Sequence, residues 1–366
     1  MKKFLLFLCI GILLVGGAMD LSAEELTKVK VGITPYSMYQ IWYIAKEYEI
    51  DKEFGLDLTL VPLTQTMHGV QLLIRGDLDI TANCVAEHVP TFEAAPQVVA
   101  FSTVGFFQGF FFVGRKGEVK SFDELKAEMG LEDAKKYRLN QFKGKEFCII
   151  PQRKSLILDA IQQVGLTADD VKFMNFADDQ KAAVAFMRGA GDFYIGSLPQ
   201  ERKLIMMEDK YVNAGGAEIL GPGGLWYDTM VSTEKFLNEQ KETALRLLGV
   251  LYRSIKLFDE KTEEVAVIGA KGISKVTGGD FSVDEYIQMQ TKYDDFLSIA
   301  EAKAGYYNSD SPLYWAKPVN YYVKMAIEQG DLKGPVNGEK YYILSEKLFS
   351  EFLERNDLMS LVEEVL

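Results

Sequence analysis

The sequence is poor in the residues that most often carry out chemistry. Its 366 residues include three cysteines and two histidines. Cys9 lies in an apolar run near the start, and the remaining pair, Cys84 and Cys148, is too small for a disulfide framework. His68 and His88 lack acidic or cysteine neighbours at the spacings of zinc sites. We therefore expect neither a metal nor a cofactor.

Motifs of the common enzyme classes are also missing. The chain contains no GxSxG elbow, no Walker A loop and no dinucleotide fingerprint, and the glycines of GPGG (221–224) lack the strand-to-helix context of a phosphate loop. Cys84 and His88 are close enough in sequence for a Cys–His pair. We favour instead a buried, unreactive thiol at a strand end, with His88 in a structural role. The prediction is a protein without catalytic residues.

Basic residues are fewer than acidic ones. Lys and Arg number 40 and Asp and Glu 53, giving a net charge of −13. Such a surface repels nucleic acids and anionic membranes. Long apolar runs are lacking too, since the run at 4–15 is too short to span a bilayer. It follows Lys2-Lys3 and precedes small residues ending at Ala23, which indicates a signal peptide over 1–23 and a soluble periplasmic protein. The alternative is an uncleaved membrane anchor.

One phrase occurs twice, 113 residues apart. Residues 74–80 read IRGDLDI and residues 187–193 read MRGAGDF. In both copies a helical pattern ends at Arg-Gly and a strand follows. Arginine is favourable at a helix C-terminus and glycine permits the left-handed turn beyond it. We therefore assign a structural role to the arginines and aspartates of both copies.

The order of elements around the two copies is the same. Each copy ends a strand–helix–strand–helix series and starts a third strand, judged from apolar residues at i, i+3, i+4 and i+7 and from alternating segments. The predicted first-copy elements are strands at 28–33, 57–63 and 79–82 and a helix at 66–75. The second-copy elements are strands at 146–150 and 171–176 and a helix at 179–188.

This pattern predicts an α/β protein of two lobes, each a mostly parallel sheet flanked by helices. Glycine-interrupted β-rich runs at 98–115 and 217–233 are the predicted crossings between the lobes and form the hinge. The predicted boundaries are 24–112 with 225–366 for lobe 1, and 113–224 for lobe 2. Ligands of open α/β sheets bind beyond the carboxyl ends of the strands, so the cleft between the lobes is the expected site.

The ordered set of segments resembles a known family. KVKVGITPYSMYQIWYIAKEYEIDKEFGLDL, LLIRGDLDI, SFDELK, FKGKEFCII and RGAGD follow one another as in periplasmic substrate-binding proteins of ABC importers, within the nitrate, sulfonate, taurine and thiamine-precursor group. The resemblance implies a type II periplasmic binding fold and a permease and an ATPase of the inner membrane as partners. Two departures are an insertion at 127–142 and the loop Pro151–Ser155, where relatives have small polar residues.

Ligand-binding candidates come from the loops at the predicted carboxyl ends of the strands and from the crossings. Aromatic faces with a few polar groups suit a small organic ligand. The candidates are Tyr36, Tyr39, Thr64, Thr66, Asn83, Phe107, Gln108, Gln152, Arg153, Ser155, Ser197, Trp226 and Tyr227.

Arg153 lies at a predicted helix N-terminus, where a cation opposes the helix dipole unless it binds an anion. The predicted function is therefore that of an exported, monomeric solute-binding protein whose ligand is small and anionic or zwitterionic, sulfonate-like or like a vitamin precursor. Two alternatives stay open. One is an enzyme of the pyrimidine-synthase type on the same fold, whose cysteine-rich segment is missing here. The other is a partner that presents ligand to a sensor receptor.

Overall fold

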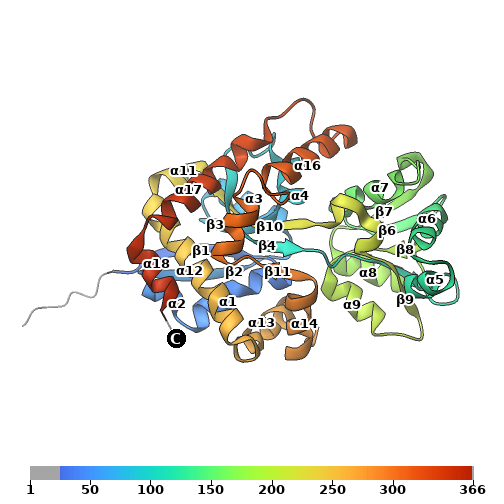
Figure 1. Ribbon diagram of the computed structural model, residues 1–366, viewed down its shortest axis with the longest axis horizontal. Helices are drawn as coiled ribbons and strands as arrows, with labels where there is room; N and C mark the ends of the chain where they lie inside the picture. The colour runs from blue at the N-terminus through green and yellow to red at the C-terminus, as the bar shows by residue number, and fades with distance from the viewer. Residues whose placement is uncertain (1–24, 278, 365–366) are drawn as a thin grey trace, which may run out of the picture.

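Two β-sheets, each covered by helices, form two lobes joined at a narrow waist (Figure 1). The computed structural model describes residues 25–277 and 279–364. The predicted signal peptide at 1–23 lies outside this part of the chain. Within it, no helix has the length and apolar character needed to cross a membrane.

The first lobe is built on a six-stranded sheet in the order β11-β4-β10-β3-β1-β2. Strands β1, β2 and β3 run parallel, as predicted, whereas β10 is antiparallel to both β3 and β4. Its strands are β1 (Thr27–Ile33), β2 (Leu56–Pro62), β3 (Ile80–Cys84), β4 (Val98–Phe107), β10 (Trp226–Thr233) and β11 (Asp294–Phe296).

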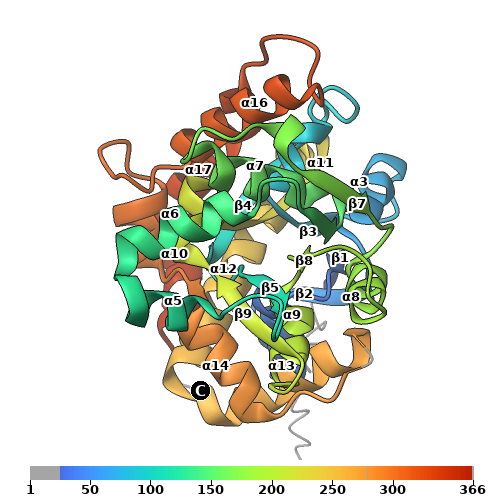
Figure 2. The same ribbon diagram turned by 90° about the vertical axis from the view of Figure 1, so that its right-hand side faces the viewer.

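Helices from both ends of the chain cover this sheet. The early ones are α1 (Ile41–Glu47), α2 (Ile50–Glu53), α3 (Thr66–Arg75) and α4 (Val85–His88). The late ones are α11 (Glu234–Glu239), α12 (Lys241–Glu260), α13 (Thr262–Thr277), α14 (Val283–Lys292), α15 (Ile299–Glu301), α16 (Ala316–Gln329), α17 (Ile343–Leu353) and α18 (Asn356–Glu363). The helical tail thus packs on the first lobe (Figures 1 and 2).

The second lobe uses one continuous stretch of chain, in the sheet order β7-β6-β8-β5-β9. Strands β6, β7 and β8 are parallel, and β5 is antiparallel to β8 and β9. The strands are β5 (Phe112–Arg115), β6 (Glu146–Ile149), β7 (Lys172–Asn175), β8 (Phe193–Tyr194) and β9 (Tyr211–Gly215). The helices are α5 (Phe122–Met129), α6 (Leu131–Gln141), α7 (Lys154–Gln162), α8 (Asp179–Met187), α9 (Leu198–Ile205) and α10 (Ala217–Leu220).

The predicted α/β two-lobe fold is confirmed, with one difference in the sheets. Each sheet has a parallel core of three strands, with the strand that comes first in sequence in the middle. In each, an antiparallel strand is hydrogen-bonded beside the third core strand, β10 in the first sheet and β5 in the second. These two strands adjoin the crossings, so they enter their sheets from the end that faces the other lobe.

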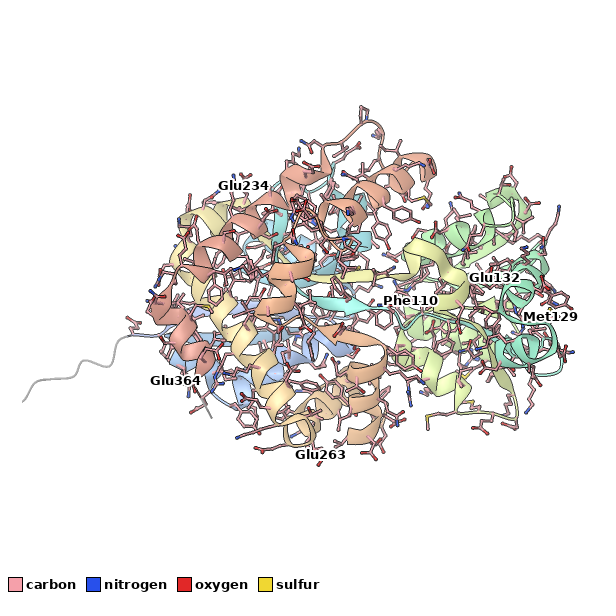
Figure 3. The ribbon with its side chains drawn as sticks, in the orientation of Figure 1. Phe110, Met129, Glu132, Glu234, Glu263 and Glu364 are labelled. Carbon is pink, nitrogen blue, oxygen red and sulfur yellow. The ribbon has the colours of Figure 1, made fainter. Side chains whose placement is uncertain are left out.

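The insertion at 127–142 forms the end of α5 and the whole of α6, at the far end of the second lobe. Met129 and Glu132 mark this end in Figure 3. Arg138 of α6 is fully buried and donates to the carbonyl of Lys120 and, at 2.9 Å, to Gln141 Oε1. The insertion is therefore packed into the lobe, away from the cleft.

The repeated phrase marks the same joint in both lobes. The Asp79 amide donates to Lys30 O at 3.0 Å, and Asp79 Oδ2 accepts from the Lys30 amide at 2.8 Å. Asp192 makes the same pair of bonds with Glu146, at 2.7 and 2.9 Å. Each aspartate thus holds the third core strand of its lobe to the first, which confirms the structural role predicted for them.

The glycine of each copy should be needed for its backbone conformation alone. Gly76 and Gly189 have φ of 78° and 99°, and a Cβ at either would meet no atom within 4 Å. We expect Gly76→Ala and Gly189→Ala each to lower the unfolding free energy by about 1 kcal/mol, the cost of a left-handed alanine. Urea denaturation measures this. Gly334→Ala, equally open and without positive φ, is the control, and equal values for all three variants would contradict the expectation.

Candidate functional site

A cavity lies between the lobes, at the carboxyl ends of the parallel strands. We call it the inner cavity. It is lined by residues from the segments that follow β1, β3, β6 and β8 and from the start of β10. Five aromatic side chains form much of its wall: Tyr36, Tyr39, Phe107, Phe110 and Trp226. The polar side chains are Ser37, Glu87, Arg153, Ser197, Asp228 and Asp294. Phe110 marks its position between the lobes in Figure 3.

An outer cavity continues from the inner one. It shares Tyr36, Glu87 and Ser197 with the inner cavity and adds polar residues such as Thr64 and Gln152. The inner cavity has a volume of about 30 Å³ and the outer about 390 Å³. The inner volume corresponds to roughly two water molecules. The arrangement suits a ligand with a small polar head and a larger body.

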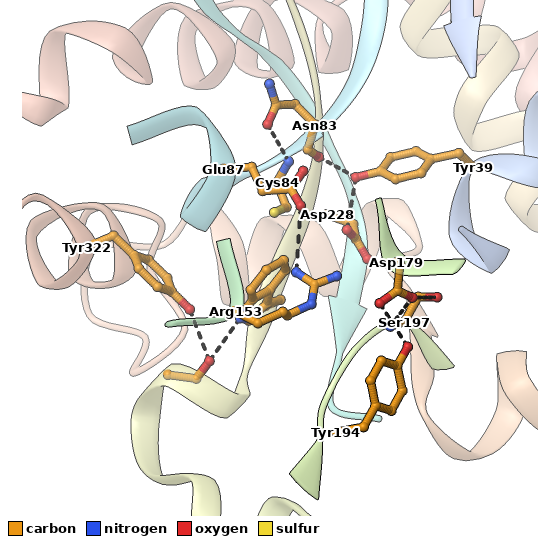
Figure 4. Close-up of polar contacts among 12 residues, drawn as sticks. Tyr39, Asn83, Cys84, Glu87, Arg153, Asp179, Tyr194, Ser197, Asp228 and Tyr322 are labelled. Carbon is orange, nitrogen blue, oxygen red and sulfur yellow. Dashed lines mark hydrogen bonds and ion pairs between the residues drawn. The ribbon is translucent and has the colours of Figure 1, made fainter. Parts of the chain in front are cut away.

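Arg153 is the central cation of the inner cavity. It precedes α7, in the short 3-10 turn Pro151–Arg153 after β6, and it is 2% exposed. Its guanidinium packs over the rings of Phe110 and Trp226, 4.7 and 4.4 Å from their centroids. Nη1 lies 3.6 Å from Oε1 of Glu87, which belongs to α4 of the other lobe (Figure 4). Arg153 therefore joins the two lobes through an ion pair shielded from water.

Other contacts across the cleft keep the lobes together. The Gln65 side chain donates to the carbonyl of Ala177, and Arg202 Nη2 lies 3.2 Å from Gln288 Oε1. The Tyr322 hydroxyl donates to Gly223 O at 3.1 Å, and the same carbonyl accepts the Trp226 indole N–H at 2.9 Å. These bonds fix the orientation of Trp226 in the cavity wall.

Asp228 is a buried acid of the inner cavity. It is 7% exposed, and its Oδ1 accepts from the Tyr39 hydroxyl at 2.9 Å. The same hydroxyl contacts the carbonyl of Asn83 (Figure 4). Burial raises the pKa of Asp228 to about 7, with a smaller contribution from the nearby Glu87 charge, although the Tyr39 bond opposes the rise. Asp228 thus titrates near neutral pH.

Asp179 organises the second lobe's side of the cleft. It begins α8, where Oδ1 accepts from the Tyr194 hydroxyl at 2.8 Å and Oδ2 accepts from the Ser197 amide at 2.7 Å (Figure 4). The Ser197 hydroxyl also donates to Oδ2. These bonds place Ser197 at the boundary of the inner and outer cavities.

Most of the predicted binding residues come together at the cleft. Six line the inner cavity: Tyr36, Tyr39, Phe107, Arg153, Ser197 and Trp226. Thr64, Thr66 and Gln152 line the outer cavity. Their role in binding stays a prediction.

Four predicted residues lie elsewhere. Tyr227 follows Trp226 on β10 and so faces the opposite side of the sheet, where it packs on Phe106 and Tyr306. Gln108 is exposed beside β11. The Asn83 side chain turns to the Cys84 amide, and Ser155 lies on α7 outside both cavities. Strand alternation explains the position of Tyr227, because neighbouring residues of a strand face opposite sides of the sheet.

In the described part of the chain, the hydrogen bonds of His88 go to groups other than Cys84. His88 is fully buried, 3.1 Å from the Tyr342 hydroxyl and 3.2 Å from Val98 O, and burial lowers its pKa to about 4. His68 is exposed on α3. Cys84 lines the inner cavity, but burial and then the Glu87 charge raise the pKa of its thiol, which keeps it protonated. Among the described residues, no group of His, Cys, Asp and Glu could hold a metal ion.

Sequence reasoning missed the acids of the inner cavity. Glu87 lies in a short segment beside His88 and carries no pattern of its own that indicates a site. Asp228 could have been found, because it shares a face of β10 with Trp226 by strand alternation. Asp294 gave no local signal, because it comes from the helical tail and joins the site only when β11 pairs with β4.

Comparisons with known proteins agree with this geometry. A family model described as "NMT1/THI5 like" matches residues 125–264, less than half of the chain. No protein of curated function matches the sequence. The periplasmic aliphatic sulphonate binding protein SsuA from Escherichia coli has a similar structure, with a TM-score of 0.66 and 12% identity, covering 88% of this chain and 99% of that one.

Two further structures show the same similarity. The nitrate-binding protein NrtA from Synechocystis PCC 6803 has a TM-score of 0.64 at 12% identity, over 93% of this chain and 92% of its own. The alkanesulfonate-binding protein SsuA from Xanthomonas axonopodis pv. citri, bound to MOPS, has a TM-score of 0.58 at 15% identity, over 81% and 95%. All three are named as binding proteins rather than enzymes. The resemblance predicted from the sequence is thereby confirmed, and the chain has the two-lobe fold of the periplasmic binding proteins.

Proposed function

We propose that this protein captures a small organic ligand between its lobes and delivers it to the permease and ATPase of an ABC import system. The observation that carries the proposal is the aromatic cavity at the carboxyl ends of both sheets, lined from both lobes and spanned by the Arg153–Glu87 pair. A ligand that contacts both lobes favours the arrangement in which they meet. The similar structures named for sulfonate and nitrate binding support this role.

Export through the predicted signal peptide, a periplasmic location and a monomeric state belong to the same proposal. The cavity favours a zwitterionic ligand over a simple anion, because Arg153 already faces Glu87 and two further acids line the wall. The raised pKa of the Cys84 thiol supports capture over catalysis.

Mass spectrometry of the small molecules released by the denatured protein, followed by adding the identified compound back, tests the proposal. We expect the compound to raise the unfolding free energy by about 2.7 kcal/mol at a concentration one hundred times its dissociation constant. Its mass should stay unchanged after prolonged incubation. Conversion to a product of different mass would show an enzyme instead.

A further inference from the structure

The inner cavity contains more acidic than basic side chains. Glu87, Asp228 and Asp294 line it, and Arg153 is the basic residue among the described residues of its lining. Glu87 already lies opposite Arg153 at 3.6 Å. Asp228 and Asp294 are therefore left without a cation in the cavity wall. Because a buried carboxylate without a counter-charge is costly, burial raises the pKa of both groups.

Asp294 has one carboxylate oxygen that the protein does not use. The residue is 5% exposed, and its Oδ2 accepts from the Ser37 hydroxyl and, at 3.1 Å, from Gln290 Nε2. Its Oδ1 is buried and has no hydrogen-bond partner among the described residues. Since a lost partner for a buried acceptor costs about 1–3 kcal/mol, a donor from outside the protein would be favourable here.

Glu87 offers a second acceptor from a different element. It is also 5% exposed, and while Oε1 faces Arg153, Oε2 is buried without a hydrogen-bond partner among the described residues. The rings of Tyr36, Tyr39 and Phe107 line the same cavity as these two acids. Aromatic faces attract cations and suit a flat apolar body.

We infer that the ligand has a positively charged nitrogen group with hydrogen-bond donors, which Asp294 and Glu87 bind, joined to a flat apolar part that the aromatic wall holds. The inference rests on the proposed function and names its ligand class. Arg153 pairs with Glu87 at 3.6 Å and would also lie beside an acceptor atom on the same ligand. A purely anionic ligand would instead face three acids and one base.

Two probes of opposite charge test the inference. Benzamidine and benzenesulfonate both consist of a phenyl ring with one compact head group, cationic in the first and anionic in the second. Titration calorimetry and thermal melting at pH 8 should show benzamidine binding at least tenfold more tightly than benzenesulfonate. Asp294→Asn should weaken benzamidine binding at least tenfold. Asp295→Asn, the same change one residue along the strand on an exposed side chain, should leave it unchanged.

Each other result would overturn the inference. Equal or tighter binding of benzenesulfonate would show an anion site, and binding of neither probe would exclude a general site for flat cations. Unchanged benzamidine affinity in both Asp294→Asn and Glu87→Gln would show that the cation binds elsewhere. Two variants are used because one of them could fail to fold. These outcomes leave ligand capture intact, whereas conversion of the copurified ligand to a new product would end the proposed function itself.

Discussion

Replacing Arg153 by methionine should open the lobes of the ligand-free protein. Methionine keeps much of the side-chain volume but leaves Glu87, which is 5% exposed, without its counter-charge. Breaking a buried pair in this way costs about 3–5 kcal/mol. When the lobes separate, water can solvate the lone carboxylate, so the cost falls on the closed arrangement alone. Small-angle X-ray scattering should show a larger radius of gyration for the variant.

A double-mutant cycle separates this pair from its surroundings. Glu87→Gln alone should also open the lobes, because it leaves the Arg153 charge buried. The double variant Arg153→Met/Glu87→Gln should recover much of the closed form, since neither charge is then left unpaired. Lys154→Met is the control, because Lys154 is the adjacent cation and lies outside both cavities. If the effects of the two single variants on the radius of gyration simply added in the double variant, the role given to the pair would be contradicted. The same holds if Lys154→Met opened the lobes as far as Arg153→Met.

Replacing Asp228 by asparagine should stabilise the protein at pH 8 and have little effect near pH 4. The pKa of Asp228 rises from 3.8 to about 7 on folding, chiefly through burial, so the folded state keeps its proton between these values. Above pH 7 folding must bury the ionised carboxylate. A shift of about 3 pKa units corresponds to roughly 4 kcal/mol. This penalty is absent below pH 3.8, the pKa of Asp228 in the unfolded state. Asparagine removes the penalty at high pH, and its amide oxygen can still accept the hydrogen bond from the Tyr39 hydroxyl.

Urea denaturation at several pH values between 4 and 8 measures the difference between the variant and the parent. That difference should grow from near zero at pH 4 to its full value at pH 8. Glu87, Arg153 and Asp294 line the same cavity in both proteins, so their contributions largely cancel in the difference. Asp123→Asn, the same change on an exposed acid at a helix terminus outside the cavity, is the control. A flat profile for Asp228→Asn would show that Asp228 is ionised at no cost.

Local sequence patterns were sufficient for the parallel core of each lobe. The helix expected at 66–75 is α3, and the helix expected at 179–188 is α8, which ends one residue earlier. Apolar periodicity and glycines at helix ends are short-range signals that packing does not reverse here. The antiparallel strands were harder to place, because their direction depends on how the chain returns from the other lobe rather than on their own residues.

The site was only partly predictable for the same reason. Loops after parallel strands supplied Tyr36, Arg153 and Ser197, because strand direction alone places such loops at one edge. The acids were missed, since carboxylates are common on surfaces and only burial distinguishes those of a site. Asp294 shows the limit most clearly, as it is separated by more than 180 residues from the strand β4 beside which it lies.

The position of β10 in the first sheet also constrains the order in which the protein can form. β10 lies between β3 and β4, yet the whole of the second lobe, from β5 to β9, precedes it along the chain. As the polypeptide emerges, the second lobe becomes complete while the first still lacks a central strand. Domains generally fold as units when all their residues are present. The later-starting lobe can therefore fold first, and until β10 arrives the facing edges of β3 and β4 are open to mispairing or to a chaperone.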